Sequence, residues 1–128
     1  MKALLDTHAF LWAVTDDRRL SNVARGAIAE GANEIFLSAV SMWEIVLKAR
    51  IGKLFVEGGP TRFLEREFRR NRISPLALQP SHVLGVESLP PIHKDPFDRL
   101  LIAQAQVENL LLITGDADIA RYPVQVVW

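Results

Sequence analysis

The stretch "HKDPFDRLLIAQAQVENLLLIT", residues 93–114, combines a helix signal with a strand signal. Asp95 is a suitable N-cap and Pro96 a suitable first helical residue, since proline lacks the N–H that would go unpaired there. An apolar run of helical character follows and leads into "LLLIT" (110–114), the most strand-like run in the chain. A helix that leads into a buried strand is typical of α/β folds.

The remaining segments continue this alternation of strands and helices. No repeat or low-complexity linker divides the chain. The order predicts an α/β layer fold with a largely parallel sheet and right-handed crossovers, built as a single domain over residues 1–128. The predicted strands are 2–6, 34–38, 72–78, 110–114 and 124–128, and the predicted helices are 17–31, 38–54, 60–72, 80–89 and 95–110, with a turn and short helix at 115–122.

The composition excludes several classes of protein. The 128 residues carry a net charge of zero and include no cysteine. Disulfides and thiolate metal sites are therefore excluded, and no bulk basicity indicates a nucleic-acid partner. The first residues lack the continuous apolar stretch of a signal peptide, and no run reaches the ~18 apolar residues of a membrane span. We expect a soluble cytoplasmic protein with no membrane association.

Four acidic residues fall where an α/β sheet places its ligand sites. Asp6 closes the first predicted strand, and Asp116 lies two residues after "LLLIT". Glu44 is embedded in a largely apolar helix, and Asp98 lies in the first turn of another. Each alone has an ordinary explanation, as a cap, a turn former or part of an exposed polar stripe. All four map to the carboxyl-end edge of the sheet, and this coincidence favours a site.

Clustered carboxylates predict a bound cation. Uncompensated carboxylates repel one another and raise each other's pKa, so a positive charge is needed among them. Oxygen ligands without cysteine suit Mg²⁺ or Mn²⁺, ions that act on phosphodiesters. The segment "TRFLEREFRRNR" (61–72) holds five arginines and two glutamates. It is either a solvated helix face or the source of attraction for a nucleic-acid backbone.

Four motifs together resemble those of PIN-domain ribonucleases, specifically the VapC-type toxin of a toxin–antitoxin pair. They are "LLDTHAFLW" (4–12), "SAVSMWEIVLKARIGKL" (38–54), "HKDPFDRLLIAQA" (93–105) and "LLITGDADI" (111–119). The resemblance implies a compact three-layer α/β/α fold around a sheet of four or five strands. It also implies a metal-dependent endoribonuclease that inhibits translation and growth. The implied partners are RNA, a cognate antitoxin and a second copy of the chain, with DNA contacted only through the antitoxin.

The resemblance also assigns roles to individual residues. Asp6, Glu44, Asp98 and Asp116 match the family's acidic quartet, which holds one or two Mg²⁺ or Mn²⁺ ions. The ions would activate a water for in-line attack, giving a 5′-phosphate and a 3′-hydroxyl. Asp95 lies outside the quartet and is predicted to be the helix cap. Thr7 and Thr114 are predicted to support the acids, with structural capping as an equal alternative, and Asp118 is a supporting or turn residue. The candidate phosphate contacts are Arg62, Arg66, Arg69, Arg70 and Arg99. For Arg99, a surface ion pair is the alternative.

The histidines and two of the tryptophans give weaker signals. We expect His8 to pack near the acids, His93 to hydrogen-bond around the helix start, and His82 to lie on the surface. Trp12 and Trp43 are expected in core or dimer contacts rather than as platforms for nucleobases, because both lie in apolar helical stretches.

Other functions fit the sequence less well. A receiver-type regulator would need paired acids after the first strand and a lysine after the last, and the sequence has neither. A phosphatase with Asp6 as nucleophile would want a second acid where this chain has His8. The main alternative is a PIN-like module that binds RNA or protein without cutting, and a cleavage assay with Mn²⁺ and with EDTA separates the two.

Overall fold

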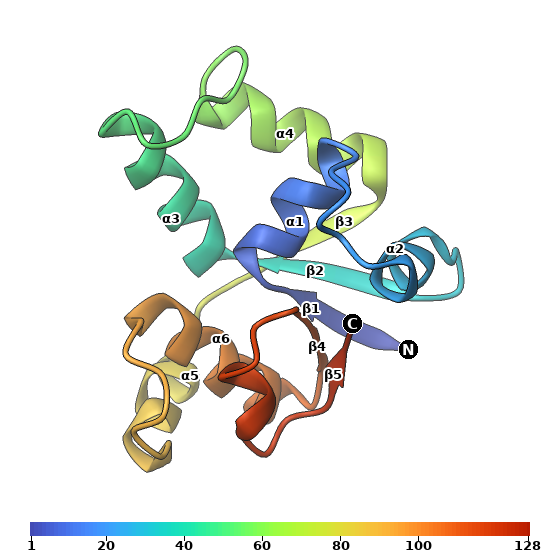
Figure 1. Ribbon diagram of the computed structural model, residues 1–128. Helices are drawn as coiled ribbons and strands as arrows, with labels where there is room; N and C mark the ends of the chain where they lie inside the picture. Colours follow the sequence, from blue (N-terminus) through green and yellow to red (C-terminus); the bar gives the residue numbers. More distant parts are fainter.

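The computed structural model describes residues 1–128, and its centre is a sheet of five parallel strands (Figure 1). The strands are β1 (Lys2–Leu5), β2 (Glu34–Ser38), β3 (Ile73–Leu76), β4 (Leu111–Ile113) and β5 (Val126–Val127). They lie in the order β3-β2-β1-β4-β5, and every neighbouring pair is parallel. The predicted parallel sheet is confirmed, with five strands.

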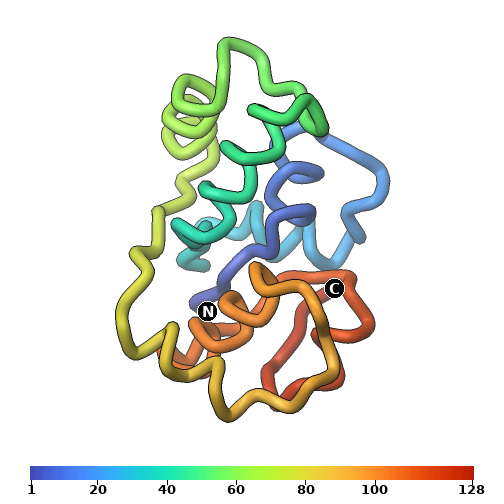
Figure 2. The backbone as a smooth tube through the Cα atoms, turned by 90° about the vertical axis from the view of Figure 1, so that its left-hand side faces the viewer, coloured from blue at the N-terminus to red at the C-terminus, as the bar shows by residue number.

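Helices cover both faces of this sheet. They are α1 (Thr7–Val14), α2 (Asn22–Ala29), α3 (Ala39–Arg50), α4 (Pro60–Asn71), α5 (Pro80–Gly85) and α6 (Pro96–Glu108), with 3₁₀ turns η1 (Val86–Ser88) and η2 (Ile119–Arg121). In Figure 1, α1, α3 and α4 lie above the sheet and α5 and α6 below it. The turned view in Figure 2 shows the same division, with green α3 and α4 above orange α6. None of the helices is long and apolar enough to cross a bilayer.

The strands are buried on both sides, which makes the architecture three-layered. Ala3 and Leu5 of β1 pack with Phe10 of α1 in the core between the sheet and the helices α1 to α4. Leu4, which points the opposite way, packs with Leu101 of α6 in the second core. A strand buried on both faces reads as a continuous apolar run rather than an alternating one, as "KALL" and "LLI" do. The expected α/β/α fold is confirmed.

The order of the strands creates a crevice at the centre of the sheet. From β1 the chain moves outward through β2 to β3, then crosses back to β4 on the other side of β1 and continues to β5. The connections on the two sides of β1 therefore run over opposite faces of the sheet. In open α/β sheets, ligands bind at such a reversal point, outside the carboxyl ends of the strands. Here that point lies between the ends of β1 and β4.

The helices differ from the prediction in two ways, because α1 is absent from the predicted helices and some of the others begin at different residues. Ser38, one of two candidate caps, accepts the N–H of Val40 at 2.9 Å and is the N-cap of α3. The helix predicted at 17–31 begins only at Asn22, because Ser21 caps it by accepting the N–H of Ala24 at 3.0 Å. The residues before it form a turn instead.

The predicted surface position of His82 is wrong. Its side chain is fully buried between α5 and α6. Its Nδ1 accepts the N–H of Gln79 at 2.9 Å, and its Nε2 lies 2.9 Å from Glu108. The histidine thus closes a capping box at the start of α5 and joins that short helix to α6.

Candidate active site

Asp6 lies at the carboxyl end of β1 and is held in place on both oxygens. It is the N-cap of α1, and one oxygen accepts the N–H of Ala9 at 2.6 Å. The other accepts the hydroxyl of Thr114, which follows β4. Burial raises the pKa of Asp6, although the bonds from Thr114 and Ala9 counteract it. The carboxylate is therefore fixed in position but costly to keep charged.

Asp116 is fixed by the turn that follows β4. Its backbone N–H donates to the hydroxyl of Thr114 at 3.0 Å, and one of its carboxylate oxygens accepts the N–H of Asp118 at 2.8 Å. Thr114 therefore orients both strand-end aspartates, a role beyond ordinary capping. Asp118 contributes through its backbone, while its side chain lies 3.7 Å from Arg121 on the surface.

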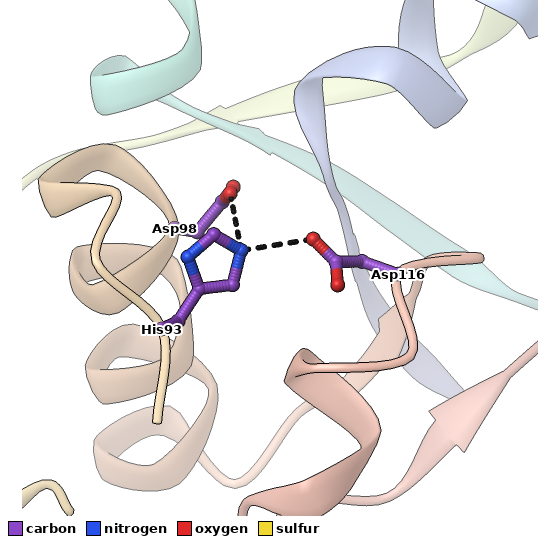
Figure 3. A group of neighbouring side chains, drawn as sticks. All are labelled: His93, Asp98 and Asp116. Atoms are coloured by element: carbon purple, nitrogen blue, oxygen red, sulfur yellow. Dashed lines mark hydrogen bonds and ion pairs between the residues drawn. The ribbon is translucent and has the colours of Figure 1, made fainter. Parts of the chain in front are cut away.

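The start of α6 has the geometry that the sequence predicts. Asp95 is the N-cap and accepts the N–H of Phe97 at 2.8 Å, with Pro96 behind it. Asp98 lies one turn in and points at the crevice, where His93 lies between it and Asp116 (Figure 3). The Nε2 atom of His93 is 3.1 Å from Asp98 and 2.9 Å from Asp116.

His93 is a hydrogen-bond donor to the two aspartates. Its Nδ1 accepts the backbone N–H of Asp95 at 3.1 Å, so Nδ1 cannot carry the hydrogen of the neutral ring. Nε2 therefore carries it and donates to Asp98 and Asp116. Burial opposes the charged ring, but the bond to Asp116 and the charge of Asp98 prevail and raise the pKa of His93. The same contact lowers the pKa of Asp116 against the effect of its burial.

Among the acids of the site, Asp98 has the pKa that departs furthest from its ordinary value. Burial raises its pKa to about 7, and the nearby charges of Asp95, Asp6 and Glu44 add to the effect, while His93 acts against it. A carboxylate with such a pKa is poorly solvated, and here it also lies near other negative charges. Asp6, Glu44 and Asp98 therefore act on one another electrostatically, and His93 links Asp98 to Asp116.

Glu44 contributes to this environment from α3. Its side chain is 6% exposed and its carboxylate lies 2.6 Å from the ammonium of Lys48, one turn later. The exposed polar stripe considered from the sequence is thus wrong for Glu44. Ser41 is also buried, and it accepts the hydroxyl of Thr7 at 2.9 Å, joining α1 to α3. Thr7 therefore has a structural contact in place of one to an acid.

An open cleft of about 410 Å³ gives access to the aspartates. His8 lies beside the acids, as expected, but the sequence does not show that His93 bridges two acids or that Trp12, Trp128 and Arg19 line the same cleft. The sequence gives no signal for Trp128 and Arg19, because the end of β5 and the loop after α1 are brought to the cleft only by the fold. The acidic cleft is lined by Asp6, His8, Trp12, Arg19, Asp98, Gly115, Asp116 and Trp128.

The candidate phosphate contacts divide between different parts of the surface. Arg66 lines a groove that shares His8 and Trp12 with the acidic cleft. Arg70 lines a separate pocket near the amino ends of β2 and β3, away from the acids. Arg99 donates to the backbone carbonyl of Pro90 at 3.0 Å and to Tyr122 at 3.2 Å, so it holds the loop before α6 rather than facing the cleft. Arg62 and Arg69 are exposed on α4.

The residues of the cleft fit a hard divalent cation. One ligand atom each from His93, Asp98 and Asp116 lie within 4.8 Å of one another, and Asp6 lines the same cleft. Carboxylate oxygens are preferred by Mg²⁺ and Mn²⁺. With its hydrogen on Nε2, His93 occupies the space between the carboxylates as a donor, and the aspartates are the natural ligands.

Comparisons with known proteins agree with this architecture. The profile of the PIN domain matches residues 3–125. The fold is similar to VapBC2 from Rickettsia felis (TM-score 0.74, 16% identity, 98% of this chain and 97% of that chain). It is also similar to a toxin–antitoxin complex from Klebsiella pneumoniae (TM-score 0.67, 20% identity) and to VapBC-1 from nontypeable Haemophilus influenzae (TM-score 0.67, 17% identity). Each of these two matches covers 98% of this chain and 96% of the other chain. No curated protein sequence matches. Because the profile spans nearly all of its length, the chain belongs to the PIN domain family.

Proposed function

We propose that the chain is a VapC-type toxin, an endoribonuclease that depends on Mg²⁺ or Mn²⁺ and inhibits translation and growth in the cytoplasm. Its partners would be RNA, a second copy of the chain and a cognate antitoxin. It would contact DNA only through the antitoxin. The similar structures from Rickettsia felis, Klebsiella pneumoniae and Haemophilus influenzae are described as VapBC or toxin–antitoxin complexes, which supports the antitoxin partner.

The observation that carries the proposal is the convergence of acids from different elements at one edge of the sheet. Asp6 follows β1, Asp116 follows β4, and Asp98 begins α6, yet all three line one cleft. The pKa of Asp98 is raised to about 7 by burial and by its acidic neighbours. Such an arrangement is unfavourable for the fold by itself and suits a site that binds a cation and a phosphodiester.

Each residue of the proposed metal site would have a separate role. When bound, a divalent ion lowers the pKa of water and polarises a phosphoryl oxygen. Asp6, Asp98 and Asp116 would hold it, with Glu44 adding negative charge from α3. The hydroxyl of Thr114 donates to Asp6 and accepts the backbone N–H of Asp116, so it helps to position both residues. His93, which donates to Asp98 and Asp116, would adjust the charge of both.

A cleavage assay with purified protein and an unstructured RNA tests the proposal. We expect cleavage with Mn²⁺ or Mg²⁺, none with EDTA, and products with a 5′-phosphate and a 3′-hydroxyl. Asp98→Asn should lower the cleavage rate roughly a thousandfold or more, because it removes a charge that holds the ion. The matched control is Asp95→Asn at the same helix start, which keeps the cap and should retain most activity.

Two results would contradict this function. Cleavage that persists in EDTA would indicate a reaction that does not use the metal. Absence of cleavage on any RNA, combined with RNA or protein binding, would favour a PIN-like module that binds without cutting.

A further inference from the structure

Aromatic rings line the acidic cleft beside the acids. His8 and Trp12 of α1 lie with ring centroids 5.6 Å apart, and Trp12 and Trp128 lie 6.0 Å apart. All three line the cleft together with Asp6, Asp98 and Asp116. We refer to His8, Trp12 and Trp128 as the aromatic wall. The core or dimer contact predicted for Trp12 is therefore incomplete, because its ring also borders the acids.

Gly115 makes room for this wall. A Cβ atom at Gly115 would lie 2.6 Å from the indole of Trp128, closer than atoms can approach. The backbone of Gly115 is not in the left-handed region, so the chain conformation alone does not require glycine there. The missing side chain lets the indole lie directly against the turn that carries Thr114 and Asp116.

The cationic side chain of Arg19 lies over one ring of the aromatic wall, that of Trp12. The guanidinium of Arg19 is 4.9 Å from the centroid of the Trp12 ring, within the range of a cation–π contact. Two of its nitrogens donate to Asp17, at 2.8 Å and 3.1 Å, in a solvent-exposed ion pair. The cleft is thus lined by acids and by aromatic rings, and the guanidinium of Arg19 lies over one of the rings.

We propose that the aromatic wall and Arg19 bind an unpaired nucleobase of the RNA, next to the phosphodiester that the aspartates act on. Aromatic rings and guanidinium groups both stack on the flat faces of bases, and every base offers such a face. A base within a duplex is already stacked and has no free face, so the substrate class would be single-stranded RNA. This inference rests on the proposed function, because it takes RNA as the ligand.

The third tryptophan provides a control. Trp43 on α3 is 55% exposed and meets Phe97 with its ring edge-on, at 5.2 Å between centroids. It does not line the acidic cleft. A change at Trp43 therefore removes an accessible indole of the same kind without altering the proposed base site.

Binding of two labelled oligonucleotides tests the proposal. One is an oligoadenylate of about twelve nucleotides, and the other is a ribose-phosphate strand of equal length without bases. Fluorescence anisotropy is measured with Mg²⁺ in an Asp98→Asn background, which prevents cleavage. We expect the oligoadenylate to bind roughly fivefold to a hundredfold more tightly than the strand without bases. Trp128→Leu and Trp12→Leu should reduce this ratio towards one, while Trp128→Phe and Trp43→Leu should preserve it.

Several outcomes would overturn the proposal. If the leucine variants lost affinity equally for the oligoadenylate and for the strand without bases, the tryptophans would only support the fold. Equal binding of both strands by the parent protein would exclude a base site. If a leucine variant does not fold, the parent protein with Trp43→Phe gives a second measurement. Its remaining indole fluorescence should be quenched by the oligoadenylate but not by the strand without bases, and absence of this difference would reject the site.

The cleavage assay separates this inference from the proposed function. Base-dependent binding without any cleavage would support the base site and reject the nuclease. Cleavage combined with equal affinity for the oligoadenylate and the strand without bases would support the nuclease and reject the base site. Binding of a protein segment in the cleft, with no affinity for either strand, would reject both.

Discussion

His82 and His93 have the same local bonds but lie in different surroundings. In each, Nδ1 accepts the backbone N–H of the residue that caps a helix, Gln79 at 2.9 Å for α5 and Asp95 at 3.1 Å for α6. In each, the hydrogen is therefore on Nε2, which faces acid. Both histidines fix the start of a helix.

The difference lies in what Nε2 meets. For His82 it is the single carboxylate of Glu108, and the histidine is fully buried between two helices. For His93 it is two carboxylates, Asp98 and Asp116, at an open cleft. One acid completes the bonding of a histidine, whereas two acids leave negative charge in excess. The excess of charge, rather than the histidine itself, distinguishes a candidate site from a structural contact.

The largest effect on folding is expected at His82. Replacement by alanine leaves a cavity, removes the acceptor of the Gln79 N–H and separates α5 from Glu108. We expect His82→Ala to lower the free energy of unfolding by about 3 kcal/mol. Urea titration measures this loss. Cleavage per folded molecule should stay unchanged, and a selective loss of cleavage would break the contrast between the two histidines.

The reverse pattern is expected at His93. His93→Ala should lower the cleavage rate roughly tenfold to a hundredfold, because it removes a donor that orients two candidate metal ligands. Its effect on the unfolding free energy should be smaller than that of His82→Ala, since the side chain borders solvent. Initial rates at saturating Mn²⁺ and urea titration of the same preparations check both expectations. Unchanged cleavage would show that the aspartates need no orienting partner.

The raised pKa of Asp98, which is due first to burial and then to nearby acids, also predicts how stability changes with pH. Asp98 has a pKa of about 7 in the fold and 3.8 as its ordinary value, so the folded state binds the extra proton between these values. Stability of the metal-free protein should therefore fall as pH rises through this window. His93 acts in the same direction, because its raised pKa favours the charged ring in the fold and this gain is lost at higher pH.

Thermal unfolding with EDTA measures this dependence. The loss should be on the order of 2 kcal/mol between about pH 5 and about pH 8. Asp98→Asn should flatten the curve, and Mn²⁺ should raise the melting temperature most at the higher pH. A curve for Asp98→Asn as steep as that of the parent would assign the dependence to other groups.

The smallest effect is expected at the cap. Asp95→Ala removes the acceptor of the Phe97 N–H and should cost about 1 kcal/mol, whereas Asp95→Asn keeps a capping oxygen and should cost much less. Asp95→Asn also removes a charge that raises the pKa of Asp98, so the pH midpoint of the stability curve should move to lower pH. An unchanged midpoint would show that Asp95 acts only as a cap.

The sequence predicts most of what depends on local signals. The start of α6 follows from Asp95 and Pro96, and the position of Asp6 and Asp116 follows from strands that end in acids. Their roles in catalysis remain predictions. The burial of His82 was not predictable, because the short apolar pattern at 80–89 does not show which side faces α6.

Contacts between distant segments account for the remaining differences. Arg66 and Arg70 lie one turn apart on α4, yet they line different pockets. Which of them faces the cleft depends on how Phe63 and Leu64 pack into the core, and that is a property of the whole fold. Trp128 likewise reaches the acids only through the pairing of β5 with β4.

The bond between Thr114 and Asp6 joins residues 108 positions apart in the chain. Asp6 leaves the ribosome well before Thr114 and Asp116. A nascent chain that has not yet reached β4 lacks both the strand that pairs with β1 and the hydroxyl that orients Asp6. The candidate site is therefore complete only once β4 and the turn after it have been synthesised.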